Sequence, residues 1–272
     1  MALHALRRGR QAKGLGERLR WRITAWRLGN YERQLVARAQ ASVFVSPTDA
    51  ACTANNGNRS RVHVIPNGVD FDYFAPGSSA QPESVEPTVL FTGHLSFEPN
   101  REAALALVDE VLPRIRASVP NAVCTIVGAD PPTELMRRHD GRRVFVTGRV
   151  ADLRPYFDKA WVYVCPMRLG AGIKNKLLEA MAMEKAIVTT PRAVEGLPVR
   201  ENEHLLLAND YPGMASRAVE LLRNRERRGS LGRQARWLVS ERYRWGTASL
   251  AYEQLYERLR SRQARTPAEV TR

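Results

Sequence analysis

The stretch RLGAGIKNKLLEAMAMEKAIVTT, residues 168–190, joins a glycine-rich turn, an amphipathic helix and a short apolar strand. Its periodicity predicts a helix over 173–183 and a strand over 186–190. Gly170, Ala171 and Gly172 come just before the helix, where backbone N–H groups and the positive end of the helix dipole can face one ligand. The turn therefore indicates a binding site for an anion the size of a diphosphate.

Three charged residues follow this turn, and they allow two interpretations. Lys174 and Lys176 fall in the first turns of the predicted helix, where a lysine can join the backbone amides on an anion. Glu179 lies three residues after Lys176 on the same face, and its carboxylate could accept both hydroxyls of a ribose. The alternative is a surface ion pair between Lys176 and Glu179 on an ordinary helix.

Outward from this stretch, strands alternate with helices. Short, nearly uninterrupted apolar strands separated by helices predict a parallel sheet covered on both faces, hence a Rossmann-like, doubly wound α/β domain. The predicted strands are 89–92, Val123–Val127, 144–147, 161–165, 186–190 and 205–207; the predicted helices are 100–117, one from Thr133, one from Asp152, 173–183, and further helices to about residue 240.

In such a sheet, ligands bind beyond the carboxyl ends of the strands. Three further loops at such ends begin with glycine, which lets backbone amides approach a ligand, although tight turns also use glycine. The loops are Gly93-His94-Leu95, Gly128-Ala129-Asp130 and Gly148-Arg149-Val150.

The regions flanking this domain are simpler. Residues 1–75 predict a basic helix to about residue 40, strands over 42–46 and 62–65, and a weak helix after Pro47. Breaker residues over 75–87 predict a linker before the α/β domain, which we place over 85–240. Apolar positions at helical spacing over 245–259 predict a last packed helix, which we place in a segment over 241–262.

The net charge of +14 is the compositional outlier of this 272-residue chain. Between Arg7 and Arg38 there are ten Arg or Lys against Glu17 and Glu32. With Trp21 and Trp26 among them, this segment over 7–38 is typical of a helix at a membrane surface, and equally of one that packs on protein. No nucleic-acid-binding module accompanies the charge, so we expect no nucleic-acid partner.

The three cysteines form no CxxC pair, which disfavours a disulfide framework or a zinc site. No apolar run is long enough to span a bilayer, and the first residues lack the pattern of a signal peptide. We therefore expect a cytoplasmic protein, with the basic segment as the candidate for peripheral contact with the inner face of the membrane.

Four phrases in order resemble the C-terminal half of GT-B retaining glycosyltransferases of the family 4 type, and most nearly the sugar transferases of exosortase/PEP-CTERM exopolysaccharide systems. They are VIPNGVDFDYFAP (64–76), VLFTGHLSFEPN (89–100), FVTGRVADLRPYF (145–157) and GAGIKNKLLEAMAMEKAIVTTPRAVEGL (170–197). The resemblance implies an enzyme that moves a sugar from a nucleoside-diphosphate donor to a glycan or lipid-linked acceptor, with retention, in exopolysaccharide or cell-surface glycan biosynthesis.

The resemblance also implies site residues. Lys176 would bind the diphosphate and Glu179 the ribose, Gly148 and Arg149 would lie along the base, and Gly93 and His94 would lie near the phosphates. With Asn100, Gly170, Ala171, Gly172 and Ile173 these form the predicted donor site, in which His94, Lys176 and Glu179 are the candidate catalytic residues.

This sequence departs from the family pattern at three positions. Many members have a donor-sugar-binding Glu where Ala171 stands, a basic residue where His94 stands, and a lysine where Asn100 stands. No Asp-x-Asp metal motif accompanies the loops after the strands of the α/β domain, so we predict a reaction that needs neither metal nor cofactor.

Such enzymes have two Rossmann-like domains, and residues 1–75 resemble only the end of the first, acceptor-binding one. The resemblance implies that the rest of that domain lies outside this sequence, through truncation, a misassigned start or a separately encoded partner. The alternative function is a non-catalytic nucleotide-sugar-binding or scaffold protein.

Overall fold

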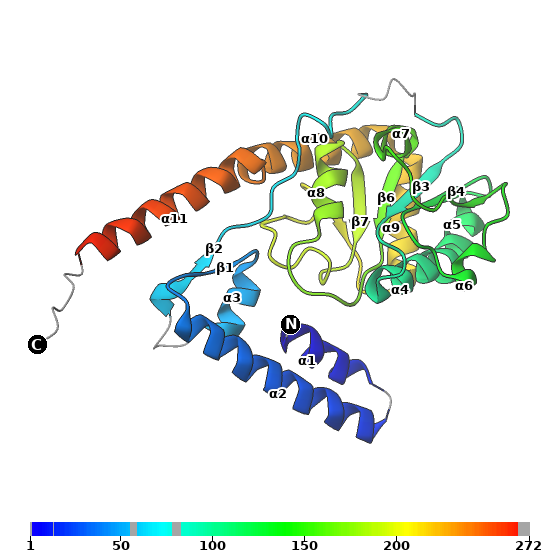
Figure 1. Cartoon of the computed structure of the whole chain (residues 1–272). Coiled ribbons are helices and arrows are strands. Elements are labelled where there is room, and N and C mark those ends of the chain that lie inside the picture. Colours follow the sequence, from blue (N-terminus) through cyan, green and yellow to red (C-terminus); the bar gives the residue numbers. More distant parts are fainter. Residues whose placement is uncertain (1, 13, 55–58, 78–82, 266–272) are drawn as a thin grey trace, which may run out of the picture. The chain divides into compact units, whose positions relative to one another are not determined.

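A computed structural model describes residues 2–12, 14–54, 59–77 and 83–265. The chain forms two compact units: a larger one over 69–242, and a smaller one built from the residues up to 68 and those from 243 onward (Figure 1). Part of the linker predicted over 75–87 lies outside the described residues, as does Lys13. Within the described residues, no helix is long and apolar enough to cross a membrane.

The larger unit is built on a six-stranded, fully parallel sheet in the order β5-β4-β3-β6-β7-β8. The direction of winding reverses between β3 and β6, which is where doubly wound sheets open a crevice for ligands. The Rossmann-like fold predicted from the sequence is therefore confirmed. The strands are β3 (Thr88–Thr92), β4 (Val123–Val127), β5 (Val144–Val146), β6 (Val162–Cys165), β7 (Ala186–Thr189) and β8 (Leu206–Leu207).

Helices cover both faces of this sheet (Figure 1). Helix α5 packs against α9, and α10 packs against α8 and β7. Every residue of β3, β6 and β7 is buried, as expected for strands sandwiched between helices. The helices are α4 (Glu98–Ala106), α5 (Leu112–Ser118), α6 (Thr133–Met136), α7 (Arg154–Lys159), α8 (Asn175–Ala182), α9 (Tyr211–Arg223) and α10 (Arg225–Arg242), with a π-helical segment η2 (Leu107–Val111) between α4 and α5.

Helix α8 begins two residues later than predicted. Gly172 has a positive φ of 69°, and Lys174 is extended at the N-cap position, so the backbone becomes helical only at Asn175. The prediction that Lys174 lies in the first turns of the helix was wrong, whereas Lys176 does lie in the first turn. The loop before α8 is longer for this reason.

The smaller unit contains two parallel strands, β1 (Ser42–Phe44) and β2 (Val62–Val64), with α3 (Pro47–Thr53) and a 3₁₀ turn η1 (Arg59–Arg61) between them. Ile65, Ala248 and Leu255 form a small buried core, so the C-terminal helix α11 (Trp245–Arg265) packs on the end of β2. The basic segment forms two helices, α1 (Ala2–Gln11) and α2 (Leu15–Arg38), which pack against each other. The single helix predicted up to residue 40 is thus divided before Gly14.

Candidate functional site

The loops after β3, β4 and β5 are tied together by backbone hydrogen bonds at the carboxyl edge of the sheet. The amide of Gly93 donates to the Val127 carbonyl (3.0 Å), and that of Leu95 to the Ala129 carbonyl (2.8 Å). The amide of Gly128 donates to the Gly148 carbonyl (3.1 Å). Three of the loops predicted to carry chemistry therefore lie side by side.

Two of these glycines lie close against neighbouring atoms. A Cβ atom on Gly128 would lie 1.7 Å from the carbonyl oxygen of Gly93. A Cβ atom on Gly93 would lie 2.6 Å from Nζ of Lys176. A side chain at position 128 would therefore force backbone to move, whereas one at position 93 would displace the end of the Lys176 side chain.

The ammonium group of Lys176 is the centre of this edge. Its Nζ lies 2.5 Å from Oδ1 of Asn100 and 4.6 Å from the centroid of the Phe91 ring. Burial lowers the pKa of Lys176 to about 8, against the favourable effects of Cys165 and Glu179. The groups in direct contact with this ammonium, Asn100 and the Phe91 ring, are neutral, so an anionic ligand beside it would stabilise its charge.

Asn100 is the residue that fixes this lysine. It lies in the first turn of α4, is 6% exposed, and its Nδ2 donates to the carbonyl of His94 (2.9 Å). It therefore links α8 to the loop after β3. Because the ammonium of Lys176 bonds to Asn100 and is not at the surface, the interpretation as a surface ion pair with Glu179 is wrong.

Glu179 lies about one turn further along α8. Burial raises the pKa of its carboxyl group, and the charge of Lys176 acts in the opposite direction. Within the described part of the chain, no side chain or amide donates a hydrogen bond to this half-buried carboxylate. A half-buried acceptor of this kind is available to hydroxyl groups of a ligand.

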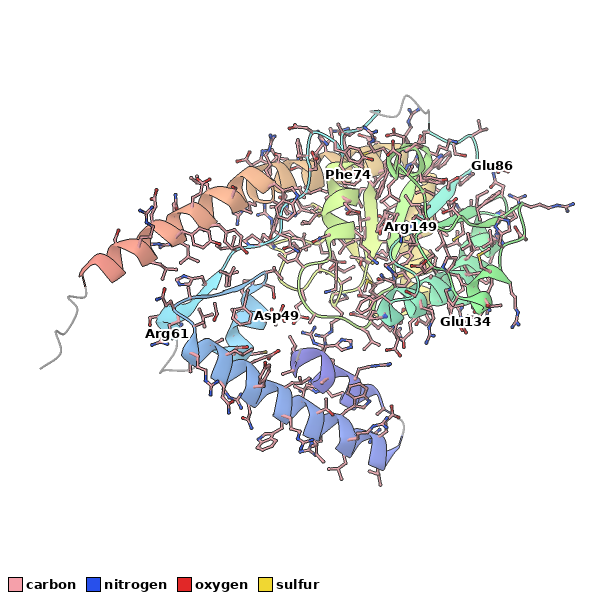
Figure 2. All side chains as sticks on the ribbon, viewed as in Figure 1. Asp49, Arg61, Phe74, Glu86, Glu134 and Arg149 are labelled. Atoms are coloured by element: carbon pink, nitrogen blue, oxygen red, sulfur yellow. The ribbon has the colours of Figure 1, made fainter. Side chains whose placement is uncertain are left out.

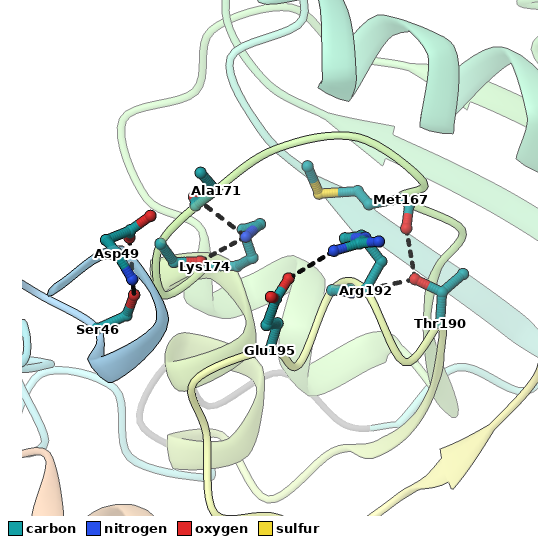
Figure 3. A network of polar contacts seen from close by, with 10 residues as sticks. Ser46, Asp49, Met167, Ala171, Lys174, Thr190, Arg192 and Glu195 are labelled. Carbon is teal, nitrogen blue, oxygen red and sulfur yellow. Dashed lines mark hydrogen bonds and ion pairs between the residues drawn. The ribbon is translucent and has the colours of Figure 1, made fainter. Parts of the chain in front are cut away.

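The loop before α8 is held by Lys174 instead. Its Nζ donates to the carbonyls of Ala171 (3.2 Å) and Gly172 (2.5 Å), as Figure 3 shows. Gly170, with φ of 115°, and Gly172 adopt conformations that side chains rarely allow, while Ile173 is buried. Lys174 therefore stabilises the conformation of this loop through hydrogen bonds to two of its carbonyl groups.

His94 and Arg149 meet at an acidic residue that our sequence analysis did not place in the site. Oδ2 of Asp130 lies 3.3 Å from Nε2 of His94 and 4.0 Å from a terminal nitrogen of Arg149. The side chains of His94, Asp130 and Arg149 are each more than half exposed (Arg149 is labelled in Figure 2). Asp130 has a φ of 53°, which is uncommon for a residue other than glycine. Its position in the loop after β4 was the sequence feature that could have indicated a site residue.

A second concave region lies beyond β7 and β8. It is a pocket of about 440 Å³ lined by Arg168, Thr190, Pro191, Arg192, Glu195 and Asn209. Thr190 donates to the carbonyl of Met167 and accepts from the amide of Ala193 (3.1 Å), and Arg192 pairs with Glu195 at 2.9 Å (Figure 3). None of these residues was among the predicted site residues.

The sequence profile described as glycosyl transferases group 1 matches residues 86–224, which is half of the chain and contains all the loops described above. The chain belongs to this family. Among its curated relatives, a GDP-mannose-dependent alpha-(1-6)-phosphatidylinositol monomannoside mannosyltransferase of Mycobacterium tuberculosis is 29% identical over 244 residues, covering 78% of this chain and 62% of that enzyme.

Another relative is described as an uncharacterized protein in the cps region of Klebsiella pneumoniae. It is 26% identical, and the match covers 50% of this chain and 37% of that protein. This glycosyltransferase chain therefore spans between about a third and two thirds of the length of these relatives.

Solved glycosyltransferase structures share the fold. Sucrose-phosphate synthase from Thermosynechococcus elongatus superposes with a TM-score of 0.73 at 23% identity, over 95% of this chain and 67% of that one. Anabaena HepE, solved in complex with UDP and glucose, gives 0.67 at 16% identity, over 84% and 67%. The parallel α/β sheet is the one found in GT-B glycosyltransferases.

Proposed function

We propose that the larger unit binds a nucleoside-diphosphate sugar for transfer of the sugar, with retention, to a glycan or lipid-linked acceptor. The observation that carries this is Lys176, a lysine with few charged partners at the carboxyl edge of the sheet, near the point between β3 and β6 where the direction of winding reverses. The names of the relatives support it: one is a GDP-mannose-dependent mannosyltransferase, and HepE was solved with UDP and glucose.

The proposed roles follow from position. Lys176 and the amides of the loop over 170–173 neutralise the diphosphate, and the charge that grows on it as the glycosidic bond breaks. Glu179 accepts hydrogen bonds from the ribose hydroxyls. Arg149 and Gly148 lie along the base, and His94, beside Asp130, donates to a phosphate oxygen.

In this mechanism the leaving diphosphate is stabilised by protein groups alone. A lysine ammonium and backbone amides that are already oriented need no rearrangement as the negative charge develops. We therefore propose that the reaction requires no metal ion or cofactor. Turnover that persists in excess EDTA is the expected result, and loss of turnover that Mg²⁺ or Mn²⁺ restores would contradict it.

The biological setting and the role of the smaller unit are also proposals. A relative in a cps region supports a role in exopolysaccharide or cell-surface glycan synthesis, as in exosortase-associated sugar transferases, with the site in the cytoplasm. We propose that residues 1–75, with the C-terminal segment over 241–262, form part of an acceptor-binding domain. A separately encoded partner could supply the remainder.

A second candidate is a non-catalytic nucleotide-sugar-binding or scaffold protein. It is favoured by Ala171, whose methyl group cannot hydrogen-bond to a sugar hydroxyl as the Glu of many family members does. Binding and turnover distinguish the two. Donor binding with release of nucleoside diphosphate, by hydrolysis or by transfer to lipid extract, supports the enzyme. Donor binding with neither supports the scaffold.

A further inference from the structure

The outward face of α2 carries a row of exposed apolar side chains that the proposed sugar chemistry does not use. Leu15, Leu19, Ile23 and Trp26 are 84%, 59%, 48% and 65% exposed. Their spacing of four, four and three residues places them along one side of the helix. We call this row the apolar stripe. Large apolar groups gathered in this way usually mark an interaction surface.

The stripe is not the surface on which α1 packs. Ala25 and Val36, on a different side of α2, are buried, and a Cβ atom on Gly9 of α1 would lie 3.0 Å from Cβ of Trp21. Helix α1 therefore covers the side of α2 that carries Trp21. The stripe faces away from this contact.

Arginines border the stripe on both sides. At 100° per residue, Arg22 falls on one border, and Arg20 and Arg27 fall on the other. Within the described residues, the guanidinium groups of Arg20, Arg22 and Arg27 make no hydrogen bond or ion pair.

The carboxylates of α2 lie elsewhere. Oε1 of Glu17 accepts from Nε1 of Trp21 (3.4 Å), and Oε1 of Glu32 accepts from the amide of Ala2 (3.2 Å), both toward α1. The borders of the stripe thus have only positive charge. A protein that bound this surface would need several acidic side chains opposite the arginines. An anionic bilayer has negatively charged headgroups everywhere along its surface.

We propose that α2 docks in the plane of a membrane rich in anionic phospholipids, with the apolar stripe in the acyl boundary and Arg20, Arg22 and Arg27 among the headgroups. Trp26 is suited to this boundary because its ring is apolar and its N–H is polar. The inference is independent of the proposed sugar chemistry.

The test is co-sedimentation of the full chain with phosphatidylcholine vesicles that contain 0 or about 30% phosphatidylglycerol, the latter giving a surface charge that attracts basic segments. The stripe variant is Leu19→Ser with Trp26→Ser. Its matched control is Leu250→Ser with Trp237→Ser, which removes the same residue types at similar exposure, 54% and 57%, on α11 and α10. Circular dichroism verifies that each variant is folded.

We expect the wild type and the control to bind anionic vesicles at least roughly tenfold more tightly than neutral ones, and the stripe variant to bind roughly tenfold less tightly than the wild type. Arg20→Gln, Arg22→Gln and Arg27→Gln together should weaken binding roughly a hundredfold, since each arginine contributes about fivefold. Absence of vesicle binding would overturn the proposal, as would equal binding by the stripe variant. A stripe variant that loses only self-association or nucleic-acid binding would also overturn it.

Discussion

At the scale of single residues, Lys176 shows how a binding site costs stability. Its pKa of about 8 lies below the value of 10.5 for a free lysine, because burial disfavours the ammonium form. Between these two pH values the unfolded chain binds more protons than the folded one, so this group makes the unliganded protein more stable as the pH rises from 8 to 10.5. Below pH 8 the buried lysine is charged in both states, and its destabilising effect on the unliganded protein is greatest.

Replacing this lysine should therefore separate stability from binding. Lys176→Met keeps the length of the side chain and removes the charge, so we expect the unliganded protein at pH 7 to gain about 1 kcal/mol, or roughly 2–4 °C in Tm. Affinity for a nucleoside-diphosphate sugar should fall by a few kcal/mol, as is typical when one oriented group facing a diphosphate is lost. Differential scanning fluorimetry and titration calorimetry measure the two effects.

Lys185→Met is the matched control. Burial also lowers the pKa of Lys185, but its Nζ donates to the carbonyl of Ala160 (3.2 Å) just before β6, at the amino edge of the sheet. Its loss should leave donor affinity unchanged. If both variants bind donor as the wild type does, Lys176 is not the diphosphate ligand.

Donor affinity should also depend on pH. The diphosphate favours the ammonium form, so the pKa of Lys176 is higher in the complex than in the free protein, and binding takes up a proton between the two values. We expect affinity to be constant well below pH 8 and to fall by up to about tenfold per unit above it. Titration calorimetry in two buffers of different ionisation enthalpy checks this. A constant affinity from pH 7 to 10 would be inconsistent with the lysine contact.

At the scale of elements, the packing of α10 against the turn after α8 depends on one glycine. A Cβ atom on Gly232 would lie 2.1 Å from the carbonyl oxygen of Glu184, a residue with a φ of 56°. Three residues earlier, a Cβ atom on Gly229 would meet only the flexible guanidinium of Arg233, at 3.0 Å. The two glycines therefore differ in what surrounds them, although both lie in the same helix.

Gly232→Ala should destabilise the larger unit by about 3 kcal/mol, the upper end for overpacking, because backbone has to move. Gly229→Ala should stabilise it by about 0.5–1 kcal/mol, because alanine is the better helix former. Urea denaturation measures both. Equal effects of the two substitutions would show that α10 does not pack on this turn as described.

The elements also show what periodicity predicts well. Buried strands such as Val123–Val127 are found where the apolar runs placed them, because a strand covered on both faces leaves a continuous apolar signature. The π-helical segment over Leu107–Val111 was not predicted, because its residues keep a helical pattern of burial. The start of α8 was predicted two residues early, because the extended backbone of Lys174 depends on contacts with the loop that sequence does not show.

The site was predictable only in part for a similar reason. Glycines after strands indicated the loops, and the order of motifs indicated Lys176. The contacts of Asn100, which joins the loop after β3 to α8, depend on the pairing of β3 with β6. Asp130 follows a strand that becomes a neighbour of β3 only in the folded sheet, so its contact with His94 has no local signature.

At the scale of the whole molecule, the two units should respond separately to core substitutions. Leu255 is 3% exposed in the core with Ile65 and Ala248, whereas Leu250 on the same helix is 54% exposed. Leu255→Ala should destabilise the smaller unit by about 2–5 kcal/mol, and Leu250→Ala by less than about 0.5 kcal/mol. Hydrogen exchange of each unit checks this. Equal loss of protection over 69–242 would mean that the units do not unfold separately.

The central claim is that Lys176 and Glu179 belong to a nucleotide-sugar site, and ligand-induced stabilisation tests it most directly. The measurement is the shift in Tm with UDP-, GDP- and ADP-sugars, for the full chain and for Lys176→Ala and Glu179→Ala, each verified as folded. We predict that at least one donor raises the Tm of the wild type by several degrees and that both variants lose most of this shift. No shift with any donor, or equal shifts in the variants, would contradict the assignment.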